Sequence, residues 1–240
     1  MKPYIVSASR REDIPASNRR MNYLLEDFKT GVFHMQGGYG NKYDIDLSNA
    51  ELLVFWSKNP KALYDHIDDI PLPFYLHYTL NDYQEFELNV PSLETRIELF
   101  QKISDKIGPE RMIWRFDPII LYWNNEDLTH IIANRMKNIG EQLRGYTNKM
   151  VFSFVQTYKG NGFVPPFMKQ QQEFLDKIIS NNRNYWGNIE IASCAEKLEG
   201  VKHNKCMDPE LIRKILGDRE WLNTIKKDKG QRELCSCVIS

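Results

Sequence analysis

Short apolar runs alternate with amphipathic segments along the whole chain, and this alternation constrains the fold more than any other feature of the sequence. The apolar runs are rich in β-branched and aromatic residues, and most of them end in a polar cluster. They cover residues 4–13, 52–60, 74–82, 112–118, 150–159 and 189–196. A short run that is apolar on both faces is typical of a buried strand in a parallel sheet.

The segments between these runs have the apolar spacing of amphipathic helices. They cover residues 19–31, 92–108, 126–145 and 165–182. Strands that alternate with helices predict a parallel sheet with helical crossovers. We therefore predict an α/β fold, a TIM-like (β/α) barrel, complete or partial, in a single domain of residues 1–217. A doubly wound open sheet is the alternative, and the turn-rich region 32–50 is expected to form a hairpin or an irregular excursion.

The charge balance argues against a general affinity for polyanions. Lys and Arg together number 32, as do Asp and Glu, so the formal net charge is zero. A neutral chain has no overall electrostatic reason to bind nucleic acid or an anionic membrane, although a local basic patch leaves nucleic acid open. The sequence contains no apolar run of membrane-spanning length and no apolar signal-peptide core near its start. We expect a cytoplasmic protein without a membrane partner.

Polar side chains follow each predicted strand, where parallel α/β folds keep their chemistry. We expect them to meet at one mouth, although strand ends are polar in any soluble barrel and each residue has a purely structural alternative. His77, for example, lies in an aromatic strand and is equally interpreted as a hydrogen-bonded core residue. The candidates, in chain order, are Arg10, Arg11, Asp13, Lys58, Asn59, His77, Arg115, Asp117, Gln156, Cys194 and Glu196.

These residue types suit a small-molecule or nucleotide-like substrate that carries a negative charge. Arginine forms bidentate contacts with phosphate and carboxylate, so cationic side chains are expected to bind the anionic group. Asp117 and Glu196 are expected to orient these cations or to carry protons, and Lys58 and His77 are further catalytic candidates. The candidates for substrate binding are Arg10, Arg11, Asp13, Asn59, Arg115 and Gln156.

All four cysteines lie in the last fifth of the chain. They are Cys194, Cys206, Cys235 and Cys237. In a reducing compartment such residues are thiols or metal ligands, and thiolates bind zinc or iron–sulfur clusters. We predict a metal site that the four cysteines share, with residues 218–240 as a tail that packs on the barrel mouth. Four unrelated small side chains are the alternative, because the CxC spacing at the end is not a zinc-finger pattern.

Several motifs together resemble an uncharacterised bacterial family known as domain of unknown function 1848. They read, in order, "SASRREDIPA", "VFWSKNP", "HYTLN", "WRFDPI", "SFVQTYK", "CAE", "HNKCMDPELI" and "KDKGQRELCSC". The resemblance covers essentially the whole chain. It implies a radical-SAM-like barrel enzyme with an iron–sulfur cluster and S-adenosylmethionine as cofactors. Family members carry a further cysteine cluster after the CxC, which is missing before Ser240, so we expect either a truncated or a naturally short form, with zinc as the alternative metal.

Two other classes of function compete with this one. A barrel hydrolase or lyase without a cluster would use the same acids and bases, with structural zinc or free thiols. A nucleic-acid-binding or DNA-repair-related module would use the Arg10 and Arg11 patch together with exposed aromatic side chains such as Tyr39 or Trp123.

Overall fold

The computed structural model describes residues 3–9, 12–36, 42–156, 162–193 and 195–225. Seven strands form one parallel sheet with the hydrogen-bonded order β1-β4-β5-β6-β9-β10-β11. The strand bounds are β1 Tyr4–Ser7, β4 Ala50–Ser57, β5 Phe74–Thr79, β6 Met112–Ile119, β9 Lys149–Phe154, β10 Glu190–Ser193 and β11 Lys202–His203. The predicted α/β class with a parallel sheet is therefore confirmed.

The order of the strands in the sheet follows their order in the chain. A doubly wound sheet reverses its strand order at a switch point, and no reversal occurs here. A closed barrel would need hydrogen bonds between the first and last strands, and no such pairing exists among the residues that the structure describes. The predicted barrel is therefore not confirmed, whereas a doubly wound topology disagrees with the observed order.

The chain divides into two compact units, and the division falls inside β5. The described residues up to Leu76 and from Cys206 onward form the first unit, and those from His77 to Lys205 form the second. No helix in the described ranges is long and apolar enough to cross a membrane.

The first unit combines β1, β4, the hairpin β2–β3 and three α-helices. The remaining bounds are α1 Asn18–Thr30, β2 Val32–Gln36, β3 Lys42–Asp46, α2 Lys61–Asp65 and α6 Pro209–Leu216. The antiparallel β2–β3 pair confirms the predicted hairpin. Residues far apart in sequence meet here, because the Tyr75 hydroxyl donates to the Cys206 carbonyl at 2.5 Å. The Trp221 indole likewise donates to the Glu51 carboxylate at 3.3 Å.

Helix ends in the first unit follow from local side-chain chemistry. Ser17 caps α1 by accepting from the Arg20 N–H, and Gly31 ends it in the left-handed conformation at φ 78°. Asp208 caps α6 by accepting from the Glu210 N–H at 3.0 Å, as the Asp-Pro pair predicts. Asn59 also precedes a proline, but it does not cap α2. Pro60 itself is the cap residue of α2, without a side-chain hydrogen bond.

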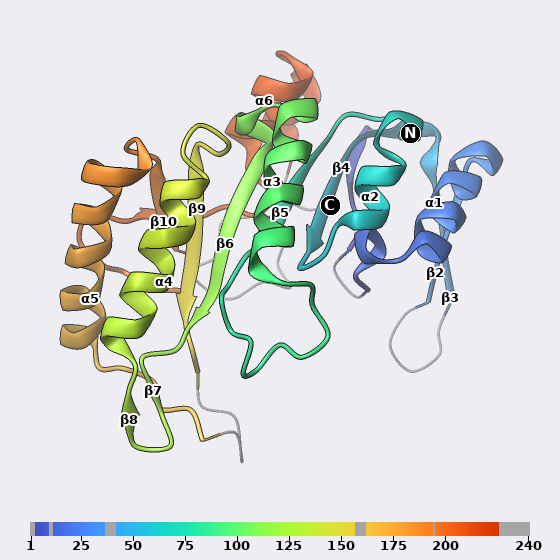
Figure 1. The fold of residues 1–240 in the computed structure, drawn as a ribbon. Coiled ribbons are helices and arrows are strands. Elements are labelled where there is room, and N and C mark those ends of the chain that lie inside the picture. Colours follow the sequence, from blue (N-terminus) through green and yellow to red (C-terminus); the bar gives the residue numbers. More distant parts are fainter. Residues whose placement is uncertain (1–2, 10–11, 37–41, 157–161, 194, 226–240) are drawn as a thin grey trace. The chain divides into compact units, whose positions relative to one another are not determined.

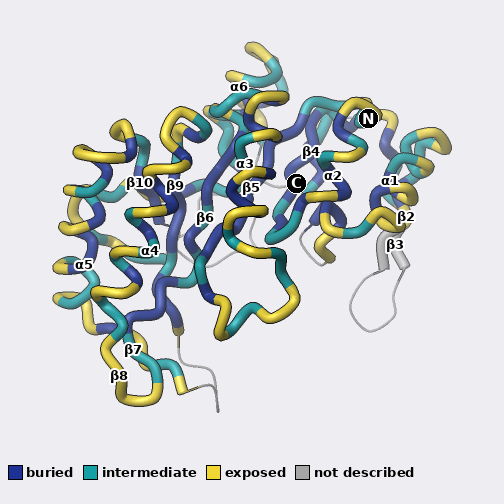
Figure 2. The backbone as a smooth tube through the Cα atoms, viewed as in Figure 1, coloured by how far each residue is buried: buried dark blue, intermediate teal, exposed yellow. Residues whose placement is uncertain are grey.

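The second unit places three helices over one face of its strands (Figure 1). Their bounds are α3 Leu93–Ile107, α4 Thr129–Gln142 and α5 Met168–Asn181. A short hairpin, β7 Tyr122–Trp123 with β8 Glu126–Asp127, follows β6. Figure 2 shows the strands between these helices as buried and the outer helix surfaces as exposed. The apolar face predicted for residues 92–108 is the buried face of α3, except that Leu93 is only half-buried.

One glycine in α4 allows a close approach of the helical turn Asn182–Trp186, which follows α5. A Cβ added to Gly140 would lie 2.3 Å from the Trp186 indole, which is far inside contact distance. Trp186 donates its indole N–H to the Lys137 carbonyl at 3.2 Å and packs edge-to-face on Trp114 at 5.3 Å. Gly140 is therefore required by packing, although glycine lowers the intrinsic stability of a helix.

Glu190 links two lysines at the amino ends of β9, β10 and β11. Its carboxylate lies 3.2 Å from the Lys149 Nζ and accepts from the Lys202 Nζ at 2.7 Å. Burial raises the pKa of Glu190, but the hydrogen bond with Lys202 and the charge of Lys149 outweigh burial and hold the pKa below its ordinary value. A carboxyl whose pKa is lower in the folded state stabilises the fold above its unfolded pKa of about 4.3.

This stabilisation should disappear as the pH falls through the folded pKa of Glu190. We expect the Glu190→Gln variant to be less stable than the wild type at neutral pH, and to lose less stability between about pH 5 and pH 3. Urea unfolding across this range measures the difference, with the exposed Glu98→Gln as control. Equal pH dependence in wild type and Glu190→Gln would contradict the prediction.

Candidate functional site

Charged side chains lie toward the carboxyl ends of β6 and β10 in the second unit, on either side of β9. Arg115 and Asp117 lie on β6 and form an ion pair, with their side chains 21% and 22% exposed. Glu196 follows β10 and is half-buried. The register pairs Arg115 with Val151 of β9, and Val151 with Ala192 of β10. These charged groups therefore come from β6 and β10, which are separated by the single strand β9.

Serine hydroxyls of the neighbouring strands hold both carboxylates in place. Ser153 of β9 donates to Asp117, and Ser193 of β10 donates to Glu196. The second carboxylate oxygen of Glu196 accepts from the Phe154 N–H at 2.9 Å. Since Ser193 also accepts from the Ala195 and Glu196 N–H groups at 3.2 Å each, the turn after β10 is fixed. Both carboxylates are thus tied to β9, Asp117 through Ser153 and Glu196 through the Phe154 N–H, and we call Arg115, Asp117, Ser153, Ser193 and Glu196 the strand-end cluster.

The Arg115 guanidinium has more N–H donors than there are acceptors around it. One Nη group donates to Asp117, while the Nε–H is shielded from water and has no acceptor among the described residues. A guanidinium offers five N–H donors in a planar fork. A buried donor without an acceptor costs free energy, so an oxyanion that approached the fork would find donors ready to bind it.

Two side chains after β5 fix the backbone on which Asp117 lies. The Asn81 amide accepts from the Asp117 N–H at 3.1 Å and donates to the Asp117 carbonyl at 3.2 Å. The Tyr83 hydroxyl donates to the Pro118 carbonyl at 2.9 Å and accepts from the Ile120 N–H at 3.2 Å. Burial raises the pKa of Tyr83 far above its ordinary value, so the phenol stays a donor. The peptide bond between Asp117 and Pro118 is cis.

We expect Asn81→Leu to lower the free energy of unfolding by about 1–3 kcal/mol, because both Asp117 backbone groups lose their partner. Asn182 provides a matched control. Its amide donates to the Ile189 carbonyl at 2.8 Å and accepts from the Ile189 N–H at 2.9 Å, away from the strand-end cluster. Asn182→Leu should cost similar stability, whereas only Asn81→Leu should weaken anion binding. Equal binding by the two variants, measured by calorimetry with inorganic phosphate, would contradict a role of Asn81 in positioning Asp117.

The first unit brings together other predicted residues at the ends of β1 and β4. The Asp13 carboxylate accepts from the Lys58 N–H at 3.2 Å. Ser57 is buried, and its hydroxyl accepts from the Asn59 N–H at 3.0 Å. Burial raises the pKa of Asp13, although hydrogen bonds from Ser57 and from the Lys58 and Ala16 N–H groups oppose this effect. Asp13, Lys58 and Asn59 are thus neighbours in the first unit, whereas the prediction that all candidates meet at one mouth stays a prediction.

The remaining predicted residues have different environments. His77 is 1% exposed in a strand whose residues are all buried, and Gln156 is exposed beyond the end of β9. Cys206 is half-buried, two residues before the cap of α6. No group of three His, Cys, Asp or Glu side chains in the described ranges is arranged to hold a metal ion. The predicted residues outside the described ranges are Arg10, Arg11, Cys194, Cys235 and Cys237.

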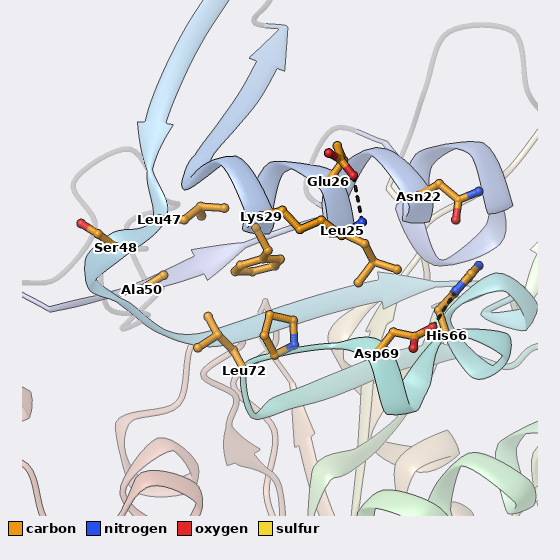
Figure 3. A pocket seen from close by; sticks show the side chains of 12 residues that line it. Asn22, Leu25, Glu26, Lys29, Leu47, Ser48, Ala50, His66, Asp69 and Leu72 are labelled. Carbon is orange, nitrogen blue, oxygen red and sulfur yellow. Dashed lines mark hydrogen bonds and ion pairs between the residues drawn. The ribbon is translucent and has the colours of Figure 1, made fainter.

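A pocket of about 820 Å³ lies in the first unit, and no pattern in the sequence points to it. It opens between α1, the start of β4 and the segment that leads into β5 (Figure 3). None of the predicted site residues lines it. The lining residues are Asn22, Leu25, Glu26, Phe28, Lys29, Leu47, Ser48, Ala50, His66, Asp69, Pro71 and Leu72.

Comparison with known proteins gives one match. Residues 5–240 match the model of a family described as a domain of unknown function, DUF1848. No curated protein and no solved structure matches the chain significantly. The family match agrees with the motifs, and the chemistry has to be argued from the residues themselves.

Proposed function

The chain belongs to the DUF1848 family, and we propose that it is an enzyme that binds a small anionic substrate at the strand-end cluster. A phosphate-containing or nucleotide-like molecule is the proposed substrate class. The observation that carries this proposal is the half-buried set of Arg115, Asp117 and Glu196 on both sides of β9, together with an Arg115 Nε–H that has no acceptor among the described residues. In parallel α/β proteins this edge of the sheet is where ligands bind.

Each residue of the cluster has a proposed role. Arg115 binds the anionic group through its guanidinium fork, and Asp117 orients that fork through their ion pair. Glu196 is the proposed proton carrier, because its carboxylate is held by Ser193 and the Phe154 N–H at the same edge. Asn81 and Tyr83 maintain the backbone on which Asp117 lies.

An incomplete (β/α) barrel is the proposed architecture. The sequential strand order supports it, as do the three helices that cover one face of the second unit. Radical-SAM-like, iron–sulfur-dependent chemistry is the corresponding proposal for the reaction, and it rests on the family resemblance, with the four cysteines as the proposed ligands. Of the four predicted ligands only Cys206 lies in the described ranges, where no three-residue metal site exists. We therefore assign no catalytic step to a metal.

The metal part of the proposal is tested by anaerobic purification with iron and sulfide. Bound metals and the visible absorption spectrum are measured for wild type, for Cys206→Ser and for the double variant Cys235→Ser/Cys237→Ser. Stoichiometric iron with a charge-transfer band that the variants lose would support a cluster. Bound zinc, or no metal with anion binding retained, would favour a cluster-free hydrolase or lyase at the same site.

A further inference from the structure

The pocket in the first unit has preformed walls. Gly31 ends α1 in the left-handed conformation, and its carbonyl accepts from the Leu47 N–H at 2.8 Å. Asp46 accepts from the Ser48 N–H at 2.9 Å and fixes the turn before β4. The opposite wall is held to β4 by the hydrogen bond from the Leu53 N–H to the Pro73 carbonyl at 3.0 Å. The volume of the pocket, about 820 Å³, falls in the range of small-molecule binding sites.

Half of the lining residues are apolar. Leu47 and Ala50 are buried, while Leu25, Phe28 and Leu72 are only half-buried. In Figure 3, Leu25 from α1 and Leu72 from the opposite wall flank the space. A ligand with an apolar body would remove this partly exposed surface from water, which is worth about 25 cal/mol per Å².

Both walls carry a pair of opposite charges at the rim. On α1, the Lys29 Nζ lies 3.0 Å from the Glu26 carboxylate. On the other wall, the His66 imidazole lies 3.1 Å from the Asp69 carboxylate. Three of these four side chains are more than 60% exposed, so each ion pair contributes little to the stability of the fold. Each side chain can therefore leave its partner and pair with a ligand.

From these features we infer that the pocket binds a zwitterionic small molecule with an apolar body, of the class of free apolar amino acids. An ammonium group would pair with Glu26 or Asp69, and a carboxylate with Lys29 or His66. A ligand that carries a single charge would be attracted by one side chain of each pair. The other side chain of the same pair would repel it. All residues that line the pocket belong to the first unit and all residues of the strand-end cluster to the second, so the two are separate sites.

The experiment is a titration of the full chain with L-phenylalanine, followed by calorimetry and saturation-transfer NMR. Phenethylamine, which lacks the carboxylate, and 3-phenylpropionate, which lacks the ammonium group, are the matched probes. We expect saturable binding of L-phenylalanine and at least about tenfold weaker binding of either analogue. Leu25→Gln should weaken L-phenylalanine binding by a similar factor, while Leu88→Gln, at an exposed leucine of the second unit, should leave it unchanged.

Exposed variants keep the test decisive if Leu25→Gln fails to fold. Lys29→Gln and Asp69→Asn alter side chains that are 72% and 63% exposed, and each should weaken L-phenylalanine binding without unfolding the chain. The inference is overturned if L-phenylalanine does not bind saturably, if either analogue binds as tightly, or if neither charge variant weakens binding.

Discussion

Replacing Arg96 with methionine is expected to lower the free energy of unfolding by about 3–5 kcal/mol. Arg96 lies on α3 and is 1% exposed, yet it carries a full charge. Its guanidinium donates to the Asn81 carbonyl at 2.7 Å and lies 3.5 Å from the Glu87 carboxylate. Methionine would leave the carboxylate of Glu87, which is itself 9% exposed, without its cationic partner in the interior. Urea unfolding of wild type and variant measures the difference.

A surface arginine provides the control for this prediction. Arg111 lies 3.8 Å from Glu110 at the other end of β6, with both side chains partly exposed, so Arg111→Met should change stability by less than about 1 kcal/mol. Adding Glu87→Leu to Arg96→Met should restore much of the loss, because the uncompensated charge is then gone. Similar losses of stability in Arg96→Met and Arg111→Met would show that the buried pair of Arg96 and Glu87 does not stabilise the fold as described.

Arg115→Gln is expected to weaken the binding of inorganic phosphate and adenosine monophosphate by about 100-fold, equal to about 2.7 kcal/mol. The side chain keeps its amide donors but loses the charge and the fork geometry that suit an oxyanion. Calorimetry with the full chain gives the dissociation constants. Arg111→Gln removes the same charge at the opposite end of β6 and should leave binding unchanged.

Asp117→Asn separates binding from a purely structural effect. The amide oxygen of the substituted side chain can still accept from Arg115 and orient its fork, while the competing negative charge disappears. We therefore expect anion binding to be retained or strengthened in Asp117→Asn. If Arg115→Gln and Asp117→Asn weaken phosphate binding equally, the ion pair is structural and the proposed role of Arg115 is wrong.

Most of the strands and helices follow from the sequence because their signals are local. The apolar runs near residues 52–60, 74–82 and 112–118 became β4, β5 and β6, and the amphipathic segment 92–108 became α3. Their polar ends lie mostly in the turns beyond the strands, which explains why β1 stops at Ser7 while the predicted run continues to residue 13. Their strand-end positions also made Arg115, Asp117 and Glu196 candidates from the sequence alone.

The residues that hold the site together carry no comparable local signal. Ser153 and Ser193 are single hydroxyls within apolar strands, and their roles depend on the register between β6, β9 and β10. Asn81 and Arg96 act through contacts with segments that are 36 and 15 residues away. Such contacts depend on the parallel packing of the folded chain, which single-sequence patterns do not specify. The pocket beside α1 likewise arises where separate segments meet.

The most direct test of the central claim observes the Arg115 side chain itself. The protein is labelled with ¹⁵N-arginine, and the guanidinium signals are followed by NMR during a titration with adenosine monophosphate. We expect a saturable shift of the Arg115 Nε–H signal, since this donor lacks an acceptor in the described part of the protein, while the Arg111 signal stays in place. An Arg115 signal that does not move, or that moves no more than the Arg111 signal, would contradict anion binding at the strand-end cluster.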